Sequence, residues 1–313
     1  MPLETSPGAG APLLQVRDMA VDFQTIDGTV HAVEGVDLDI AAGETVAIVG
    51  ESGSGKSTTA MAIIGLLAGN GHVSAGSIRL DGQELVGASE SVMRSVRGAK
   101  IGLVPQDPMS NLNPTSRIGT QVAETLLAHG LATPKNVDEK VVETLAAAGL
   151  PNAAERAKQY PHEFSGGMRQ RAMIAMGLMG KPALIIADEP TTALDVTVQR
   201  EVLGLLHEVR EETGAAILLI SHDMAVITGM CTRVLVMFAG EIVEDIAVDD
   251  LIAGRAKHPY TRALIAAVPT MSTDRDKPLA TVDEAWQVES LDAEESTADI
   301  ELEELLAVAE EIR

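Results

Sequence analysis

The stretch Gly50-Glu51-Ser52-Gly53-Ser54-Gly55-Lys56-Ser57 decides the fold of this 313-residue chain. It fits the phosphate-binding pattern G-x-x-x-x-G-K-[ST] without a mismatch. Residues 45–49 before it form an apolar run that is typical of a buried strand, and residues 57–67 after it have the pattern of a helix. Strand, glycine-rich loop and helix in this order predict a loop that binds phosphate, and they disfavour a chance glycine-rich turn.

The residue types of this loop suit a nucleoside triphosphate. Glycines allow tight turns, so successive N–H groups point inward at an anion, and the dipole of the following helix adds to the attraction. Lys56 can reach the β- and γ-phosphates, and the hydroxyl of Ser57 is a ligand for Mg²⁺. We expect the nucleotide to be bound by Gly50, Ser52, Gly53, Ser54, Gly55, Lys56, Ser57 and Thr58.

Two later apolar runs end in residues that handle metal and water. Residues 183–187 lead into Asp188, which suits the magnesium shell, and Glu189, which can polarise the attacking water as a general base. Residues 217–220 lead into Ser221 and then His222, which can reach a γ-phosphate or order the water. An acidic pair or a histidine at a strand end is often only structural, but the phosphate-binding loop favours the catalytic interpretation.

A second glycine-rich stretch, Ser165-Gly166-Gly167, opens a helical pattern that runs to about residue 179. A hydroxyl and two glycines at a helix N-terminus favour the binding of an anion there. Nothing else in the chain suggests a second nucleotide of its own. The stretch therefore suits the γ-phosphate of a nucleotide held by another subunit.

Together these motifs resemble the ATP-binding-cassette (ABC) ATPases over about residues 12–245. The matching order is the phosphate loop, Gln106, Ser165-Gly166-Gly167, Asp188-Glu189, Asp195 and His222. The resemblance implies an α/β fold of the P-loop NTPase type, with a parallel core sheet between helices, an antiparallel β-subdomain and a helical subdomain. It also implies hydrolysis of ATP to ADP and phosphate with Mg²⁺.

The same resemblance implies further site residues. Gln106 is expected to sense the γ-phosphate, to share in the magnesium site and to open a hinge that contacts membrane subunits, with a plain linker as the alternative. Asp195 is expected to reach across to a partner ATPase. An aromatic residue contacts adenine in this family, and Phe23 is the best candidate, with core packing as the alternative. His31 is a weaker neighbour of the base.

Whole phrases look like the oligopeptide/dipeptide branch of importer ATPases, whose members handle peptides, nickel and sometimes oligosaccharides. These phrases span residues 104–108, 111–114, 164–171, 191–199 and 258–264. The branch implies a second ATPase, expected to be a paralogue in a head-to-tail dimer, two transmembrane permease subunits and an extracellular solute-binding protein. The chain would then lie at the cytoplasmic face of the membrane, held by the permease subunits. Rival interpretations are a soluble ABC ATPase of DNA repair or translation, and a regulatory ATPase without a channel.

Composition and pattern divide the chain into four parts. We expect a disordered leader at 1–12, a nucleotide-binding domain at 13–247 with its helical subdomain at about 107–165, a C-terminal extension at 248–271 and an acidic tail at 272–313. The tail is expected to end in an amphipathic helix that docks on its own domain, on the partner ATPase or on nothing. Its apolar stripe comprises Ile300, Leu302, Leu305, Leu306, Ala309 and Ile312.

The net charge and the cysteine content argue against a nucleic-acid-binding protein, a disulfide-bonded protein and an iron–sulfur protein. A net charge of −23 argues against nucleic-acid binding, which favours a basic face. Cys231 is the single cysteine, so a disulfide within the chain is excluded, and we expect a small buried hydrophobe there. Because no cysteine follows it, the iron–sulfur cluster of some relatives is not expected.

The sequence has no apolar run of about 18 residues, the length that spans a bilayer. Residues 1–12 lack the basic residues of a signal peptide. Both observations favour a location in the cytoplasm.

Overall fold

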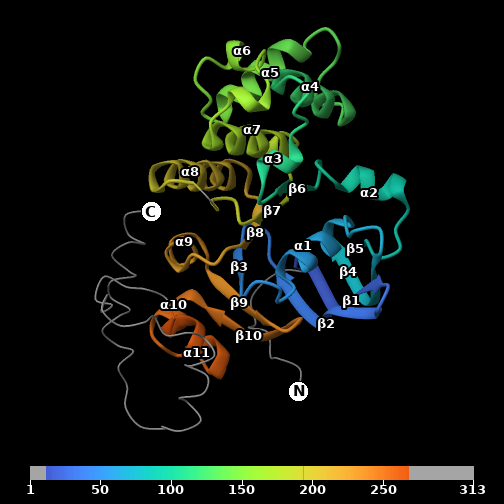
Figure 1. Cartoon of the computed structure of the whole chain (residues 1–313), viewed down its shortest axis with the longest axis vertical. Coiled ribbons are helices and arrows are strands. Elements are labelled where there is room, and N and C mark those ends of the chain that lie inside the picture. The colour runs from blue at the N-terminus through green and yellow to red at the C-terminus, as the bar shows by residue number, and fades with distance from the viewer. Residues whose placement is uncertain (1–11, 193, 268–313) are drawn as a thin grey trace.

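The computed structural model describes residues 12–192 and 194–267, and a six-stranded sheet lies at its centre (Figure 1). The strand order is β10-β9-β3-β8-β7-β6, with β10 antiparallel to β9 and the other neighbours parallel. The strands are β3 (Thr45–Val49), β6 (Ile101–Val104), β7 (Leu184–Asp188), β8 (Ala216–Ile220), β9 (Arg233–Phe238) and β10 (Glu241–Ala247). Since β3 lies between β8 and β9, the phosphate loop that follows it leaves the middle of the sheet's carboxyl edge.

Both faces of this sheet are buried, which explains why its strands read as continuous apolar runs. All five residues of β3 are buried. Val46 and Ile48 belong to one core cluster, and Ala47 and Val49 belong to another on the opposite face. The strands predicted at 45–49, 183–187 and 217–220 are present within one residue of those limits.

A second, antiparallel sheet has the strand order β2-β1-β4-β5. Its strands are β1 (Leu14–Thr25), β2 (Gly28–Ile40), β4 (Gly71–Leu80) and β5 (Gln83–Glu84). The short β runs expected between residues 13 and 42 are in fact two long strands, which pair from Leu14 with Ile40 to Thr25 with Gly28. This sheet is the expected antiparallel β-region.

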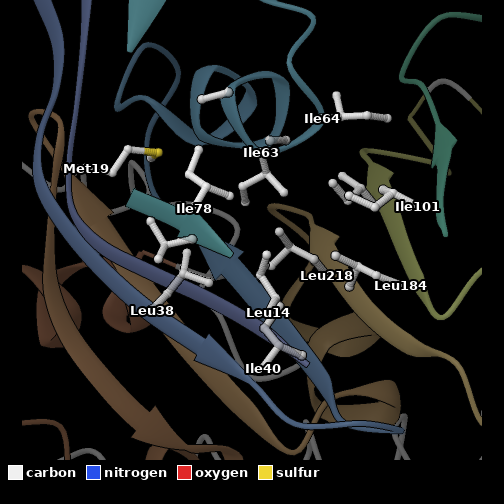
Figure 2. Packing of buried hydrophobic residues seen from close by; sticks show 14 of the residues in the cluster. Leu14, Met19, Leu38, Ile40, Ile63, Ile64, Ile78, Ile101, Leu184 and Leu218 are labelled. Atoms are coloured by element: carbon white, nitrogen blue, oxygen red, sulfur yellow. The ribbon is translucent and has the colours of Figure 1, made fainter. Parts of the chain in front are cut away.

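Helix α1 (Lys56–Ile64) packs between the two sheets and starts directly after the phosphate loop. Figure 2 shows Ile63 of α1 close to Ile78 of the antiparallel sheet and above Leu218 of the central sheet. The helix ends earlier than the predicted residue 67. Gly65 adopts a left-handed conformation with φ 66° and donates its N–H to the carbonyl of Ala62, which closes the last turn.

The helical region between β6 and β7 has a hydrophobic core of its own. Its elements are α3 (Pro108–Asn111), α4 (Ile118–Ala128), α5 (Val137–Ala147), α6 (Ala153–Arg156), the 3-10 helix η1 (Pro161–Glu163) and α7 (Gly166–Leu178). Ala172 and Met173 of α7 join this core, whereas Ile174 and Leu178 join the core against the central sheet. Helix α7 therefore connects the helical region to the sheet, as the view in Figure 1 shows.

The remaining helices complete the described part of the chain. They are α2 (Glu90–Val96), α8 (Val196–Thr213), α9 (Met224–Met230), α10 (Val248–Ile252) and α11 (Pro259–Ala266). Residues of α8 to α11 contribute to the core cluster that holds Ala47 and Val49. Among the described residues, no helix has the length and hydropathy to cross a membrane. The predicted leader, apart from Pro12, and the whole predicted tail lie outside the described residues.

Candidate active site

The phosphate loop, residues 50–57, lies tightly against the end of β9. Gly50 has φ 149°, and a Cβ at this position would lie 2.1 Å from the carbonyl oxygen of Met237. Gly55 has φ 107°, and a Cβ there would lie 2.7 Å from Cε of Met237. Glycine suits both positions because of their positive φ, and at Gly50 the backbone oxygen of Met237 also leaves no space for a side chain.

Lys56 is buried and is held by the loop itself. Its Nζ donates to the carbonyl oxygens of Gly50 at 2.8 Å and Glu51 at 2.6 Å, and to Oγ of Ser54 at 3.4 Å. Burial lowers the pKa of Lys56, although the neighbouring carboxylates of Glu189, Asp188 and Glu51 oppose that shift. Because the ammonium group has three N–H donors, it can keep the carbonyl of Gly50 and turn the other two toward phosphate oxygens.

Ser57 and Asp188 lie side by side, as their predicted shared role requires. The hydroxyl of Ser57 donates to Oδ1 of Asp188 at 3.1 Å. Burial raises the pKa of Asp188, and the hydrogen bond from Ser57 acts in the opposite direction. The pair offers two hard oxygen atoms at the carboxyl end of β7, which is a donor set suited to Mg²⁺.

Glu189 follows β7 in a left-handed conformation with φ 43°, a strained backbone for this residue type. Its N–H still donates to the carbonyl of Ile220 at 2.9 Å, which extends the pairing of β7 with β8. Oε2 of Glu189 accepts hydrogen bonds from Nε2 of Gln106 at 2.7 Å and from Oγ1 of Thr192 at 2.8 Å. The other oxygen, Oε1, lies 3.6 Å from Nδ1 of His222.

The structure thus brings the three predicted catalytic side chains, Gln106, Glu189 and His222, into one cluster. They come from three separate segments at the ends of β6, β7 and β8. Sequence reasoning missed Thr192 as a site residue. The available signal was a hydroxyl side chain three positions after the candidate base, in the loop that Pro190 begins.

Ser165, Gly166 and Gly167 lie apart from this cluster. Oγ of Ser165 caps α7 by accepting the N–H of Met168 at 3.3 Å. A Cβ on Gly167 would lie 2.4 Å from Cγ1 of Val198, so glycine allows α7 and α8 to approach closely. Within residues 12–192 and 194–267, no hydrogen bond or ion pair joins the three residues to the phosphate loop. They remain candidates for a nucleotide held by another subunit.

Asp195 caps the start of α8 within its own chain. The sequence had predicted only a contact with a partner for this residue. Its Oδ1 accepts the N–H groups of Thr197 at 3.1 Å and Val198 at 3.0 Å. The residue is exposed.

Phe23 and His31 lie at the turn end of the antiparallel sheet. Phe23 is half-buried at the edge of the core, and a Cβ on Gly71 would lie 2.5 Å from its ring atom Cε1. This partial burial agrees with core packing and leaves part of the residue accessible, so adenine contact stays a prediction. His31 pairs through Nδ1 with Asp22 at 2.8 Å.

Cys231 is buried, and burial raises the pKa of its thiol. Its burial confirms the expected small buried hydrophobe.

Residues 33–192, about half of the chain, match the family described as ABC transporter. The chain belongs to the ABC transporter family. Its central sheet, antiparallel sheet and helical region confirm the predicted fold class.

Relatives from this family extend the match along the chain. The chain is 45% identical over 271 residues to the oligopeptide transport ATP-binding protein OppD of Bacillus subtilis, covering 86% of this chain and 75% of that protein. It is 47% identical over 262 residues to OppD of Escherichia coli, covering 84% and 77%. The dipeptide transport ATP-binding protein DppD of Bacillus subtilis is 46% identical over 260 residues, covering 83% and 77%. These matches confirm the resemblance to the oligopeptide/dipeptide branch.

A solved structure shares the same fold. It is a dimeric post-hydrolysis state of an ATP-binding cassette bound to ADP and Pi. The TM-score is 0.68 at 28% sequence identity, covering 75% of this chain and 98% of that chain.

Proposed function

We propose that this chain hydrolyses ATP to energise peptide uptake through a membrane importer. The observation that carries the proposal is the meeting of Gln106, Glu189 and His222 beside the phosphate loop. The relatives support the solute class, because they are named as oligopeptide and dipeptide transport ATP-binding proteins.

The residues present fit a magnesium nucleotide. Gly50, Gly53 and Gly55 all have positive φ, the backbone conformation that lets a tight loop turn its N–H groups toward an anion. Lys56 would keep its bond to the carbonyl of Gly50 and turn its other two donors from Glu51 and Ser54 to the β- and γ-phosphates. Ser57 and Asp188 would hold Mg²⁺. When bound, the ion neutralises charge that develops between the β- and γ-phosphates.

Glu189 is the proposed general base. Because Gln106 and Thr192 both bond to Oε2, Oε1 is the oxygen that faces His222 and is available to water. As the water oxygen bonds to the γ-phosphorus, its proton passes to Glu189. The bond from the γ-phosphorus to the bridging oxygen breaks, and ADP leaves with phosphate. His222 and Gln106 would orient the water and the γ-phosphate.

The proposed assembly is a head-to-tail pair of ATPases with two permease subunits and an extracellular solute-binding protein, at the cytoplasmic face of the membrane. Exposed Ser165 and Gly166 would bind the γ-phosphate of the partner's nucleotide, and exposed Asp195 would contact the partner. The similar cassette described as dimeric supports the pairing. The net charge of −23 supports the absence of nucleic acid among the partners.

An uptake assay tests the proposal and its rivals together. Cells that lack this chain, and cells that carry it with Glu189→Gln, are supplied with a labelled dipeptide, a labelled tetrapeptide, ⁶³Ni²⁺ or a labelled oligosaccharide. The proposal expects loss of peptide uptake in both strains and its return with the unmodified chain. Loss of nickel or oligosaccharide uptake alone would favour the other solutes of this branch. Normal uptake of every solute would favour an ATPase without a transport role.

A further inference from the structure

Tyr260, on α11 of the C-terminal extension, reaches the phosphate loop. Its Oη accepts a hydrogen bond from the backbone N–H of Glu51 at 3.0 Å, although 209 positions separate the two residues. The side chain is fully buried. Burial raises the pKa of Tyr260, so the hydroxyl stays protonated at neutral pH.

Tyr260 and Lys56 bond to opposite ends of the same peptide group, the one between Gly50 and Glu51. The N–H of Glu51 and the carbonyl of Gly50 belong to one planar peptide unit and point in opposite directions. Tyr260 bonds to the N–H, and Nζ of Lys56 donates to the carbonyl at 2.8 Å. Rotation of this unit would break both bonds, so the tyrosine sets the direction of a carbonyl that positions the lysine.

The tyrosine ring is itself firmly positioned. It packs on Phe238 of β9 with ring centroids 4.5 Å apart. Its backbone N–H donates to Nδ1 of His258, which caps α11, at 3.2 Å. The carboxylate of Glu244 on β10 accepts the N–H groups of Lys257 at 2.7 Å and His258 at 3.1 Å, which ties the start of the helix to the central sheet.

The next turn of α11 also faces the phosphate loop across a small cavity. Leu264, one turn after Tyr260, lines a small cavity of about 40 Å³ together with Val49, Gly50, His222 and Met224. The helix therefore bonds to Glu51 through Tyr260, and one turn later Leu264 faces the same small cavity as Gly50.

We propose that Tyr260 is a positioning residue for the phosphate loop, which makes nucleotide affinity depend on how α11 is seated. The inference rests on the proposed function, because it assumes that residues 50–57 bind ATP. It adds a residue from outside the phosphate, magnesium and water-handling set. By linkage, nucleotide binding would in turn favour the seated position of α11.

The test is Tyr260→Phe in the full chain, which keeps the ring and its packing and removes only the hydroxyl. Tyr160→Phe is the matched control, since Tyr160 is the other tyrosine of the chain and lies before η1 in the helical region. Binding of MgATP is measured by titration calorimetry at a temperature where all three proteins are folded. We expect Kd to rise about 3- to 10-fold for Tyr260→Phe, the loss that one hydrogen bond produces, and to stay near the unmodified value for Tyr160→Phe.

Steady-state hydrolysis by the assembled ATPase separates positioning from packing. Tyr260→Phe should raise KM for ATP by a similar factor and leave kcat within about twofold, because Glu189 and His222 are unchanged. A packing role would lower the unfolding temperature without nucleotide and leave Kd and KM unchanged, and that result would overturn the inference. Absence of MgATP binding by the unmodified chain would overturn the proposed function and the inference with it.

Discussion

Nε2 of Gln106 donates a 2.7 Å hydrogen bond to Oε2 of Glu189, which joins the residue before the helical region to the residue after β7. Gln106 leads directly into Asp107, which caps α3, so a shift of the helical region would move this donor. A movement of the helical region, which packs around a core of its own, would therefore change the hydrogen bonding of the Glu189 carboxylate. This coupling gives the proposed base a link to the rest of the molecule.

Glu189→Gln should leave ATP binding almost unchanged and lower turnover by about 10²- to 10⁴-fold, the usual contribution of a general base. The amide keeps an oxygen that can accept from Gln106 and Thr192, but it cannot take a proton from water. Nucleotide titration and phosphate release measure the two effects, and gel filtration with ATP should show a trapped dimer. Glu208→Gln, the same change at an exposed position of α8, is the control. Near-normal hydrolysis, with the partner's own base also replaced, would show that Glu189 has another role.

Lys56→Ala should weaken MgATP binding by about 10- to 100-fold, because a charge-assisted contact to the phosphates is lost. The dimer should also fail to close with ATP. Calorimetric titration measures the affinity, and Lys158→Ala, which removes an exposed lysine of the helical region, is the control. Unchanged affinity together with unchanged turnover would exclude a phosphate-binding role for Lys56.

Thr192→Val should lower kcat about 3- to 10-fold and leave ATP affinity within about twofold. The change keeps the shape of the side chain and removes the hydroxyl that donates to Oε2 of Glu189. Single-turnover phosphate release measures the chemical step, and Thr191→Val makes the same substitution one residue earlier. Equal rates for the two variants would mean that the Thr192 hydroxyl does not orient the base.

Local patterns predicted much of this molecule. Residues 45–49 could be assigned to a buried strand because apolar continuity and length are properties of the segment alone. Ser57 and Asp188 were both expected at the magnesium site, and they are hydrogen-bonded at 3.1 Å, since the carboxyl ends of parallel strands share one edge of the sheet. Residues 118–129 and 137–150 also have helical periodicity, and α4 and α5 occupy these stretches to within a few residues at their ends.

Contacts that depend on tertiary placement could not be predicted. The bond from Glu51 to Tyr260 needs the position of α11 relative to β9, and no periodicity encodes it. The sequence assigned different roles to Asp188 and Glu189, but it did not show the left-handed backbone of Glu189 or the hydrogen bond from Gln106 to its carboxylate. The predicted domain limits stay predictions.

Asp188→Asn should abolish magnesium-dependent hydrolysis, with a loss of about 100-fold or more, while the folded chain without ligands stays at least as stable. The amide oxygen can still accept the hydrogen bond from Ser57. Burial raises the pKa of Asp188, which shows that the ionised carboxylate is costly inside the protein, and the substitution removes that charge. Thermal unfolding without Mg²⁺ or nucleotide, and hydrolysis with both, measure the two effects. A large drop in unfolding temperature would mean that the carboxylate mainly supports the fold.

Truncation after Met271 should leave ATP hydrolysis per assembled complex within about twofold of the full chain. The removed residues, 272–313, lie outside the described residues and contain none of the phosphate, magnesium or water-handling side chains. They carry 14 acidic and three basic residues, and the terminal apolar stripe would need a surface to bury it, so recovery of the complex should be equal or lower. Copurification with the permease subunits, followed by ATPase assays normalised to complex, separates assembly from chemistry. Normal assembly with collapsed activity would make the tail a regulator of hydrolysis and contradict its exclusion from the active site.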